Sequence, residues 1–331
     1  MELRQFGRTG MRVTEVCLGA MTFGRETPED ESAAILARYL DAGGNFVDTA
    51  NTYNRGASEE ILGRLLQGRR DSIVLATKCR MPMGSGPNDK GASRRVIREQ
   101  VEASLRRLQT DWIDLFQIHC WDATTPLDET VSTLDDLVRV GKVRYVGASN
   151  YTGWQLATAL GVAREHGWEP YVSLQPQYSL VSRDIERELL PLAAYAGLAV
   201  LPGSPLGGGL LSGKYRPGEA PPVDTRATDT TPSALLMRMR MAEERNFAVA
   251  QEVADLAAEL GRTMAQVALN WVLHAPGVTA PILGARTVAQ IEDNLGAVGW
   301  ALDAAARQRL DDASAFERGY PYDFIDWIHT R

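Results

Sequence analysis

The chain has 331 residues, of which 44% are hydrophobic and 23% are charged, a composition ordinary for a globular protein and one that excludes disorder as the main state. Its formal net charge of -7 argues against nucleic acid or an anionic membrane surface as the main partner, because both attract basic proteins. The first residues lack the apolar stretch of a signal peptide, and no apolar run is long enough to cross a bilayer, so we expect a cytoplasmic protein. Three separated cysteines, Cys17, Cys79 and Cys120, predict neither a disulfide framework nor a metal site.

Short apolar runs alternate with longer amphipathic stretches, which is the pattern of repeated strand and helix units around a parallel sheet. A hairpin is predicted first, over residues 3–13. Strands are then predicted at residues 14–18, 45–48, 72–77, 112–119, 143–149, 171–175, 198–201 and 279–283. Helices are predicted at residues 28–41, 58–66, 93–108, 127–140, 154–165, 185–196, 242–274 and 287–297. Eight such strands close a TIM barrel, so we predict an α/β fold with one (β/α)8 domain over residues 1–331 and the hairpin across the barrel floor.

Several helix boundaries are visible in the sequence. Ser93 is placed as an N-cap, Pro28 as a first-turn residue, and Gly141 and Gly197 as left-handed terminators. One connection, residues 203–241 after the seventh strand, is long and rich in Gly, Pro and Thr. Loops of this length in a compact domain are commonly lids or binding loops, so we expect this one to form part of a site.

Four polar residues lie at or just beyond the ends of three successive predicted strands: Asp48, Tyr53, Lys78 and His119. Each has a plain explanation when it is taken singly, as a strand-end cap, a packed loop aromatic, a solvated strand end and a core histidine. Together they favour a site, because barrel strand ends face one mouth and a lysine beside an aspartate there needs it as a partner. A phenol is a weak acid at neutral pH, and a nearby ammonium stabilises its anion. Tyr53 is therefore suited to donate a proton to a carbonyl oxygen.

This quartet resembles that of the aldo-keto reductases, of the bacterial long-chain type, and the resemblance extends over nearly the whole chain. It implies an oxidoreductase that reversibly reduces an aldehyde or ketone to an alcohol, with hydride from NADPH and a proton from Tyr53. In the family pattern, Asp48 and Lys78 tune the tyrosine and His119 orients the substrate. The resemblance implies a small-molecule carbonyl substrate and no metal.

The resemblance also implies a set of cofactor contacts at the later strand ends. Ser149, Asn150 and Gln175 would hold the nicotinamide amide, and Arg286 would pair with a 2′-phosphate, which favours NADPH over NADH. Arg286, Gln290 and Asn294 share one helix face, for which a solvated surface is the plain alternative. The full set of expected cofactor contacts is Gly19, Met21, Asp48, Ser149, Asn150, Gln175, Ser204, Leu206, Gly208, Lys214, Arg226, Gly284, Arg286, Gln290 and Asn294.

Two positions depart from the family pattern. Gly203 precedes the Ser-Pro-Leu segment where relatives usually carry an aromatic residue that stacks on nicotinamide. The cofactor ring is therefore expected to have an open face, or another ring that covers it, and the affinity for cofactor to be lower. Ser179 replaces an asparagine that often follows the residue equivalent to Tyr178, and no catalytic role is assigned to Tyr178.

Other functions are compatible with parts of this sequence. The glycine-rich residues 208–214 nearly match a phosphate-binding loop, but Tyr215 stands where a magnesium-binding hydroxyl is needed, and no Rossmann fingerprint follows the first strand. A cofactor-bound sensor with little turnover, similar to the potassium-channel β subunits, stays open as an alternative. So does a reductase of a nucleotide-linked keto sugar. The natural carbonyl, the stereochemistry and the oligomeric state are left undetermined.

The sequence also offers candidates for the surroundings of the reacting carbon. Met21, Tyr53, Met81 and Trp121 could form an apolar wall there, although Met and Trp are more often plain core residues. The aromatic residues 319–327 near the end of the chain are expected either to pack against the barrel or to form a subunit contact.

Overall fold

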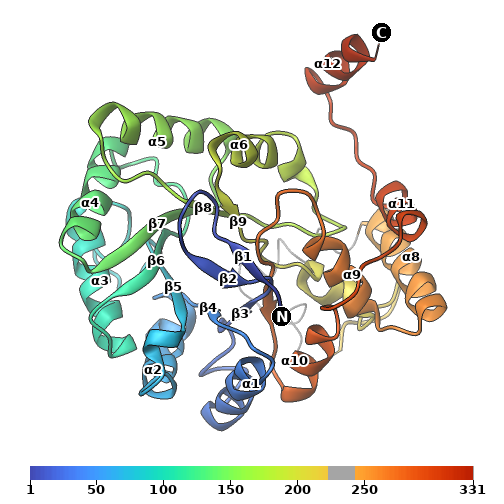
Figure 1. The fold of residues 1–331 in the computed structure, drawn as a ribbon, viewed down its shortest axis with the longest axis horizontal. Helices are drawn as coiled ribbons and strands as arrows, with labels where there is room; N and C mark the ends of the chain where they lie inside the picture. Colours follow the sequence, from blue (N-terminus) through green and yellow to red (C-terminus); the bar gives the residue numbers. More distant parts are fainter. Residues whose placement is uncertain (223–242, 331) are drawn as a thin grey trace.

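The computed structural model describes residues 1–222 and 243–330. Its centre is an eight-stranded parallel sheet in the order β10-β3-β4-β5-β6-β7-β8-β9 (Figure 1). The amides of Thr279 and Ile282 donate to the carbonyls of Val200 and Pro202, each over 2.9 Å, and so join the two outer strands. The sheet is that of a (β/α)8 barrel, as predicted. The strands are β3 (Cys17–Gly19), β4 (Phe46–Asp48), β5 (Val74–Cys79), β6 (Ile113–Ile118), β7 (Val143–Ser149), β8 (Ser173–Gln175), β9 (Ala199–Val200) and β10 (Ile282–Gly284).

Helices follow the strands and pack side by side around the outside of the barrel (Figure 1). They are α1 (Glu29–Asp41), α2 (Ala57–Leu65), α3 (Arg94–Leu108), α4 (Leu127–Arg139), α5 (Gly153–His166), α6 (Leu189–Ala196), α8 (Glu244–Leu260), α9 (Met264–Leu273), α10 (Val288–Leu295), α11 (Ala304–Ala313) and α12 (Tyr322–His329). Short 3-10 turns η1 (Tyr53–Gly56), η2 (Arg70–Ser72), η3 (Asp184–Glu186) and η4 (Gly207–Ser212) lie in the connections. No helix in the described ranges combines the length and the apolar character needed to span a membrane.

The predicted N-terminal hairpin closes one end of the barrel. Strands β1 (Leu3–Gln5) and β2 (Arg12–Thr14) pair antiparallel. Between them Phe6 is fully buried and packs edge to face on Phe46, with ring centroids 5.8 Å apart. The two rings belong to a cluster inside the barrel, so the hairpin excludes water from the floor and leaves the opposite mouth open.

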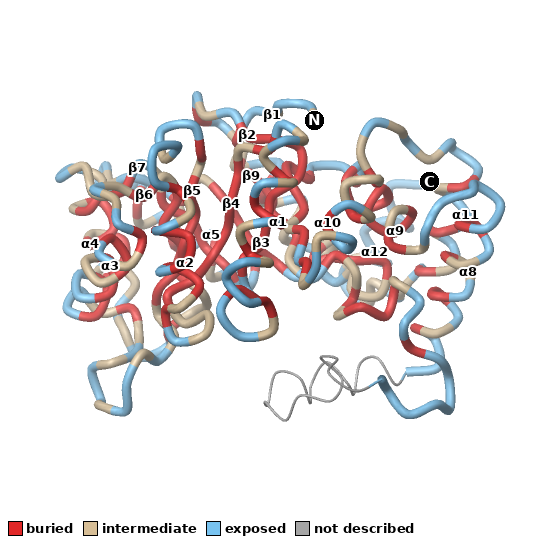
Figure 2. Tube along the Cα trace, turned by 90° about the horizontal axis from the view of Figure 1, so that it is seen from below, coloured by how far each residue is buried: buried red, intermediate tan, exposed pale blue. Residues whose placement is uncertain are grey.

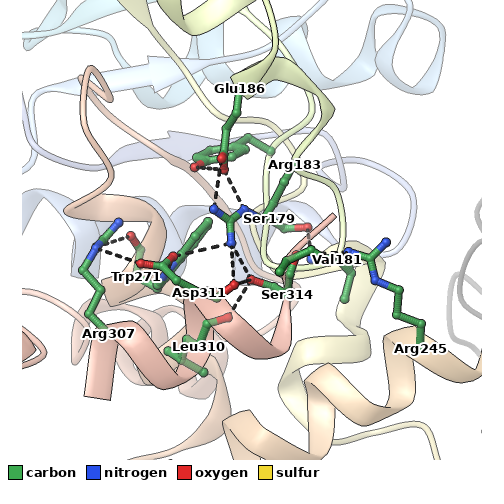
Figure 3. Close-up of polar contacts among 12 residues, drawn as sticks. Ser179, Val181, Arg183, Glu186, Arg245, Trp271, Arg307, Leu310, Asp311 and Ser314 are labelled. Atoms are coloured by element: carbon green, nitrogen blue, oxygen red, sulfur yellow. Dashed lines mark hydrogen bonds and ion pairs between the residues drawn. The ribbon is translucent and has the colours of Figure 1, made fainter. Parts of the chain in front are cut away.

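A larger apolar layer lies between the sheet and the surrounding helices. Buried residues follow the strands and the inward sides of the helices, while the outward sides are exposed (Figure 2). A separate cluster surrounds Trp271 beneath α8, α9 and α11. Beside it Arg183, from the loop after β8, donates to Glu186 and to the Ser314 hydroxyl, and Trp271 Nε1 donates to Asp311 over 2.9 Å (Figure 3).

Most predicted boundaries agree with the structure. Ser93 caps α3 and accepts from the amide of Val96. Gly141 and Gly197 have φ angles of 76° and 68°, as expected for left-handed terminators. Pro28 differs from the prediction, because it is the N-cap of α1 rather than its first residue.

Four predicted elements were wrong in extent. The helix predicted from residue 185 begins at Leu189, after η3, and the strand predicted from residue 279 begins at Ile282. The strand predicted from residue 14 begins at Cys17, because Thr14 pairs with Leu3 in the hairpin. The single helix predicted over residues 242–274 is two helices in the described part, α8 and α9. Gly261, with φ 61°, ends α8, and Thr263 starts α9 with a capping box in which it accepts from Gln266.

The C-terminal segment leaves the barrel after α11, and α12 projects away from the body (Figure 1). None of its residues is buried, and Tyr320 just before it is 87% exposed. The Tyr322 hydroxyl makes one contact with the carboxylate of Glu188. The expectation that residues 319–327 pack against the barrel is therefore wrong, and the subunit contact stays a prediction.

Candidate active site

The four residues singled out in the sequence come together at the open mouth. Asp48 is the last residue of β4 and Lys78 the last but one of β5. His119 directly follows β6, and its amide donates to the carbonyl of Cys79 over 2.9 Å. Tyr53 begins η1, five residues after Asp48. Parallel neighbouring strands end at the same edge of a sheet, so side chains distant in sequence meet there.

Lys78 is a fully buried ammonium surrounded by acceptors. Its Nζ atom lies 2.5 Å from Asp48 Oδ1, 2.7 Å from the Thr49 carbonyl and 3.3 Å from the Tyr53 hydroxyl. Burial opposes its charge, but Asp48 and Tyr53 outweigh burial and raise the pKa of Lys78 above its usual value. The ammonium therefore stays charged and ready to stabilise negative charge on the tyrosine oxygen.

The second oxygen of Asp48 is held by two glutamine amides. Gln175 Nε2 donates to Oδ2 over 2.9 Å, and Gln117 Nε2 donates over 3.2 Å. Gln175 is also an expected nicotinamide contact. Because one N–H of its side-chain amide is used in the bond to Asp48, the other N–H and the carbonyl oxygen remain for that role. Gln117 was missed by sequence reasoning. The sequence signal that could have identified it is a polar residue within an apolar strand. The structure pairs this residue in register with Lys78.

His119 lies against the ring of Tyr53, with centroids 5.8 Å apart in an edge-to-face arrangement. Burial, followed by the positive charges of Lys78 and Arg80, lowers the pKa of His119 to about 3. The imidazole is therefore neutral near pH 7. Its Nδ1 atom is buried and has no hydrogen-bond partner within the described part of the chain. A bound molecule could satisfy this nitrogen.

A cavity of about 570 Å³ opens beside the quartet, a size typical of small-molecule sites. Asp48, Tyr53 and His119 line it, while Lys78 lies behind them. Arg226 falls outside the described residues. All other expected cofactor contacts line the same cavity: Gly19, Met21, Asp48, Ser149, Asn150, Gln175, Ser204, Leu206, Gly208, Lys214, Gly284, Arg286, Gln290 and Asn294.

One region of the cavity is rich in amide and hydroxyl groups. Ser149 Oγ donates to the carbonyl of Gln175, and Asn150 donates to Ser149 Oγ and to the carbonyl of His119. Asn150 has a φ of 52° and Ser204 one of 51°, a conformation uncommon for residues other than glycine. Such backbone is retained mainly where function requires it, and here it occurs at two cavity-lining positions.

A second region carries positive charge. Lys214 lies across Gly209, where an added Cβ would sit 2.6 Å from Lys214 Cε and displace the end of the lysine side chain, and the Gly209 φ of 100° itself favours glycine. The backbone amide of Arg286 donates to Gln290, and the Arg286 guanidinium is 3.9 Å from the carboxylate of Glu26. Cations of this kind suit the phosphates of a dinucleotide.

The position of Gly203 is open on the cavity side. An added Cβ there would meet only the Pro176 carbonyl, at 3.5 Å. The described lining residues include the rings of Tyr53 and His119 and no further aromatic ring that could replace the one absent at Gly203.

Sequence reasoning did not anticipate several lining residues, namely Thr22, Gln177, Ser212, Ala265, Leu269 and Asp293. Ala265 and Leu269 come from α9, which was not recognised as a separate helix. Asp293 is adjacent to Asn294 in sequence, but it also accepts hydrogen bonds from Thr263 and Gln266 and so links α9 to α10. Whether these residues line the cavity depends on how the helices pack, and no local sequence motif predicts that packing.

Comparisons with known proteins agree with this geometry. A model of the Aldo/keto reductase family matches residues 15–315. The chain is 43% identical over 323 residues to the uncharacterized oxidoreductase YrpG of Bacillus subtilis, and the alignment covers 94% of this chain and 95% of that protein. It is 34% identical over 331 residues to norsolorinic acid reductase stcV of Emericella nidulans, with 96% of this chain and 82% of that protein aligned. It is 36% identical over 303 residues to a probable voltage-gated potassium channel subunit beta of Oryza sativa subsp. japonica, with 90% of this chain and 91% of that protein aligned. The chain therefore belongs to the aldo/keto reductase family and is an NAD(P)H-dependent oxidoreductase.

Proposed function

We propose that the protein reduces an aldehyde or ketone to the alcohol, reversibly, with NADPH as the hydride source and Tyr53 as the proton donor. The supporting observation is the contact of Lys78 Nζ with both Asp48 and the Tyr53 hydroxyl at the wall of the cavity. Relatives named as norsolorinic acid reductases favour carbonyl reduction as well. A cytoplasmic location is part of the same proposal.

The cavity residues fit a nicotinamide dinucleotide. Ser149 and Asn150 supply hydroxyl and amide groups near Tyr53, as a carboxamide requires, and Lys214 and Arg286 supply positive charge for phosphates. A guanidinium can bind a 2′-phosphate through two parallel hydrogen bonds, which favours NADPH over NADH. Glu26 near Arg286 offsets part of this charge, so the preference for NADPH is expected to be moderate.

A nicotinamide dinucleotide held by these residues would supply hydride for the carbonyl carbon. Tyr53 donates its hydroxyl proton to the carbonyl oxygen and becomes a phenolate. Lys78, 3.3 Å away, stabilises that phenolate, and Asp48 holds the ammonium in place. The neutral imidazole of His119, packed on the Tyr53 ring, can hydrogen-bond the same oxygen and so orient the carbonyl.

The proposal is tested by NADPH oxidation with 4-nitrobenzaldehyde, comparing the wild type with Tyr53→Phe. We expect the variant to lose turnover on the order of 100-fold or more, because the ring remains and only the proton donor is removed. NADPH binding, followed by fluorescence titration, should stay close to the wild-type value. Turnover of the variant near the parent level would contradict the role of Tyr53.

A cofactor-binding sensor is the second candidate, because relatives named as potassium channel β subunits match 90% of this chain. The same assay separates the two functions. NADPH binding without turnover over a broad panel of aldehydes and ketones would favour the sensor over the reductase.

A further inference from the structure

We propose that the natural substrate carries a carboxylate and that Arg80 binds it beside the reacting carbonyl, an inference that rests on the proposed carbonyl reduction. Arg80 directly follows β5, two residues after Lys78. Among the described residues, each barrel strand except β5 ends in, or is followed by, residues that line the cavity. None of the lining residues comes from the loop after β5. Arg80 therefore follows the strand whose end is not among the described lining residues, and no expected cofactor contact lies on its loop.

The loop after β5 meets the loop after β6 next to His119. Met81 Sδ and Cys120 Sγ are 3.9 Å apart, and Cys120 directly follows His119. Arg80 thus lies on the substrate-orienting side of the site. Its charge is close enough to contribute, after burial and Lys78, to the lowered pKa of His119.

The backbone at Arg80 is held in a costly conformation. Its φ of 104° lies in a region that residues other than glycine rarely adopt. Two hydrogen bonds of 2.9 Å keep it there: the Arg80 amide donates to Gln100 Oε1 on α3, and the amide of Gly91 donates to the Arg80 carbonyl. Gln100 Oε1 also accepts from Asn51 Nδ2 over 3.0 Å. A position that suits glycine carries an arginine instead, which points to a role for the side chain.

The Arg80 guanidinium lacks an anionic partner among the described residues. Its Nε atom is buried and makes no hydrogen bond there, a state that costs free energy unless a ligand supplies an acceptor. The carboxylate of Asp122 is already occupied, because it accepts from the Ala92 amide and from Thr124 and Thr125. A substrate carboxylate would offer two oxygens in the geometry that a guanidinium prefers.

An aromatic group lies on the loops after β6 and β7, beyond His119 in the sequence. Trp121, two residues after His119, packs edge to face on Tyr151 at 5.3 Å and on Trp154 at 5.5 Å. Trp154 is 62% exposed at the outer edge of this group. One cation on the loop after β5 and an aromatic group on the next two loops suit an aryl or alkyl aldehyde or ketone with a single carboxylate.

The test compares 3- and 4-carboxybenzaldehyde with 3- and 4-nitrobenzaldehyde as substrates. The nitro group matches the carboxylate in shape but carries no net charge. The readout is the ratio of kcat/KM for carboxylate over nitro substrate. We expect this ratio to exceed one in the wild type and to fall on the order of 10- to 100-fold in Arg80→Met, with partial retention in Arg80→Lys. Thermal unfolding should be close to that of the wild type, because the guanidinium makes no described hydrogen bond.

Arg69→Met is the matched control. Arg69 is exposed and precedes β5 at the opposite end of that strand, so the variant removes the same charge far from the mouth. Its substrate ratio should equal that of the wild type. A wild-type preference for the nitro compounds, or an Arg80→Met variant with an unchanged ratio, would overturn the role of Arg80 while leaving carbonyl reduction intact. Failure of the wild type to turn over either class would overturn the proposed function and this inference together.

Discussion

Two ionisable side chains within the same small mouth are shifted in opposite directions by their neighbours. Lys78 has the carboxylate of Asp48 and the phenol of Tyr53 beside it, which outweigh burial and raise its pKa. His119 is also buried, but the charges that act on it are positive, and its pKa falls to about 3. One group therefore stays charged and the other neutral under the same conditions, as the proposed chemistry requires.

The lowered pKa of His119 leads to a prediction about pH dependence. The unfolded imidazole titrates near 6.5 and the folded one near 3, so the unfolded chain binds more protons between these values. The contribution of His119 to stability is present above pH 6.5 and is lost as pH falls toward 3. The free energy of unfolding of His119→Gln should depend less steeply on pH over this range, as measured by urea titration at several pH values.

Activity gives an independent check on the same residue. An imidazole that stays neutral produces no acid limb near pH 6.5 in the profile of kcat/KM. A limb at that pH in the wild type that disappears in His119→Gln would contradict the assignment of a neutral histidine.

Arg286 leads to a prediction about cofactor choice. In Arg286→Ala, we expect the KM for NADPH to rise by about 10-fold or more, because a charged contact to the 2′-phosphate is lost. The KM for NADH should change less, since NADH lacks that phosphate. Steady-state kinetics with both cofactors measures the difference, and equal changes would remove the phosphate contact from the proposal.

Among the elements, the loop after β8 is secured by a polar network on the outer side of the barrel. Arg183 donates to both carboxylate oxygens of Glu186, over 2.7 and 3.0 Å, and to the Ser314 hydroxyl over 2.8 Å (Figure 3). Tyr178 donates to the same glutamate over 2.8 Å. The network links the loop that contains Gln177, a cavity-lining residue, to the end of α11.

Removal of this link should affect both stability and cofactor binding. For Arg183→Met, we expect the free energy of unfolding to fall by about 2 to 4 kcal/mol, because a partly buried carboxylate and phenol lose their partner. The KM for NADPH should rise more than kcat falls, since the loop borders the cavity away from Tyr53. Arg95→Met, which removes an exposed pair with Glu99 on α3, is the control and should change stability by under about 0.5 kcal/mol. Equal losses in the two variants would mean that the network does not secure the loop.

For the whole molecule, the barrel and the C-terminal helix make separate contributions. The interior cluster around Phe6, the outer layer around the sheet and the cluster around Trp271 make up the core of the described residues, whereas α12 has no buried residue. The exposed apolar side chains of α12 include Phe324 at 55% and Trp327 at 48%. The organisation of residues 1–331 as one domain stays a prediction.

Deletion of residues 320–331 should therefore leave the barrel intact. We expect the midpoint of thermal unfolding to change by under about 2 °C, since surface changes of this kind alter stability little. Calorimetry measures the midpoint, and light scattering on the same samples measures the molecular mass. A fall of several degrees together with fewer subunits per particle than in the full chain would show instead that α12 stabilises a contact between subunits.

Local patterns were enough to predict much of this fold and site. Alternating apolar and amphipathic segments identified the barrel strands, and Asp48, Lys78 and His119 could be assigned because the ends of parallel strands converge. Gln117 was missed because its partner Asp48 lies 69 positions away in the sequence, on another strand. The strain at Arg80 was also invisible, since its φ depends on hydrogen bonds to distant residues.

The order of elements, the barrel class and the residue types available for proton transfer could be read from local patterns, because periodicity, strand length and capping residues act over a few neighbouring positions. That Asp48 is shared by Lys78, Gln117 and Gln175, and that His119 is neutral, could be known only from the folded barrel. Burial and hydrogen bonding depend on residues far apart in the chain, whose distances are set by packing of the whole barrel.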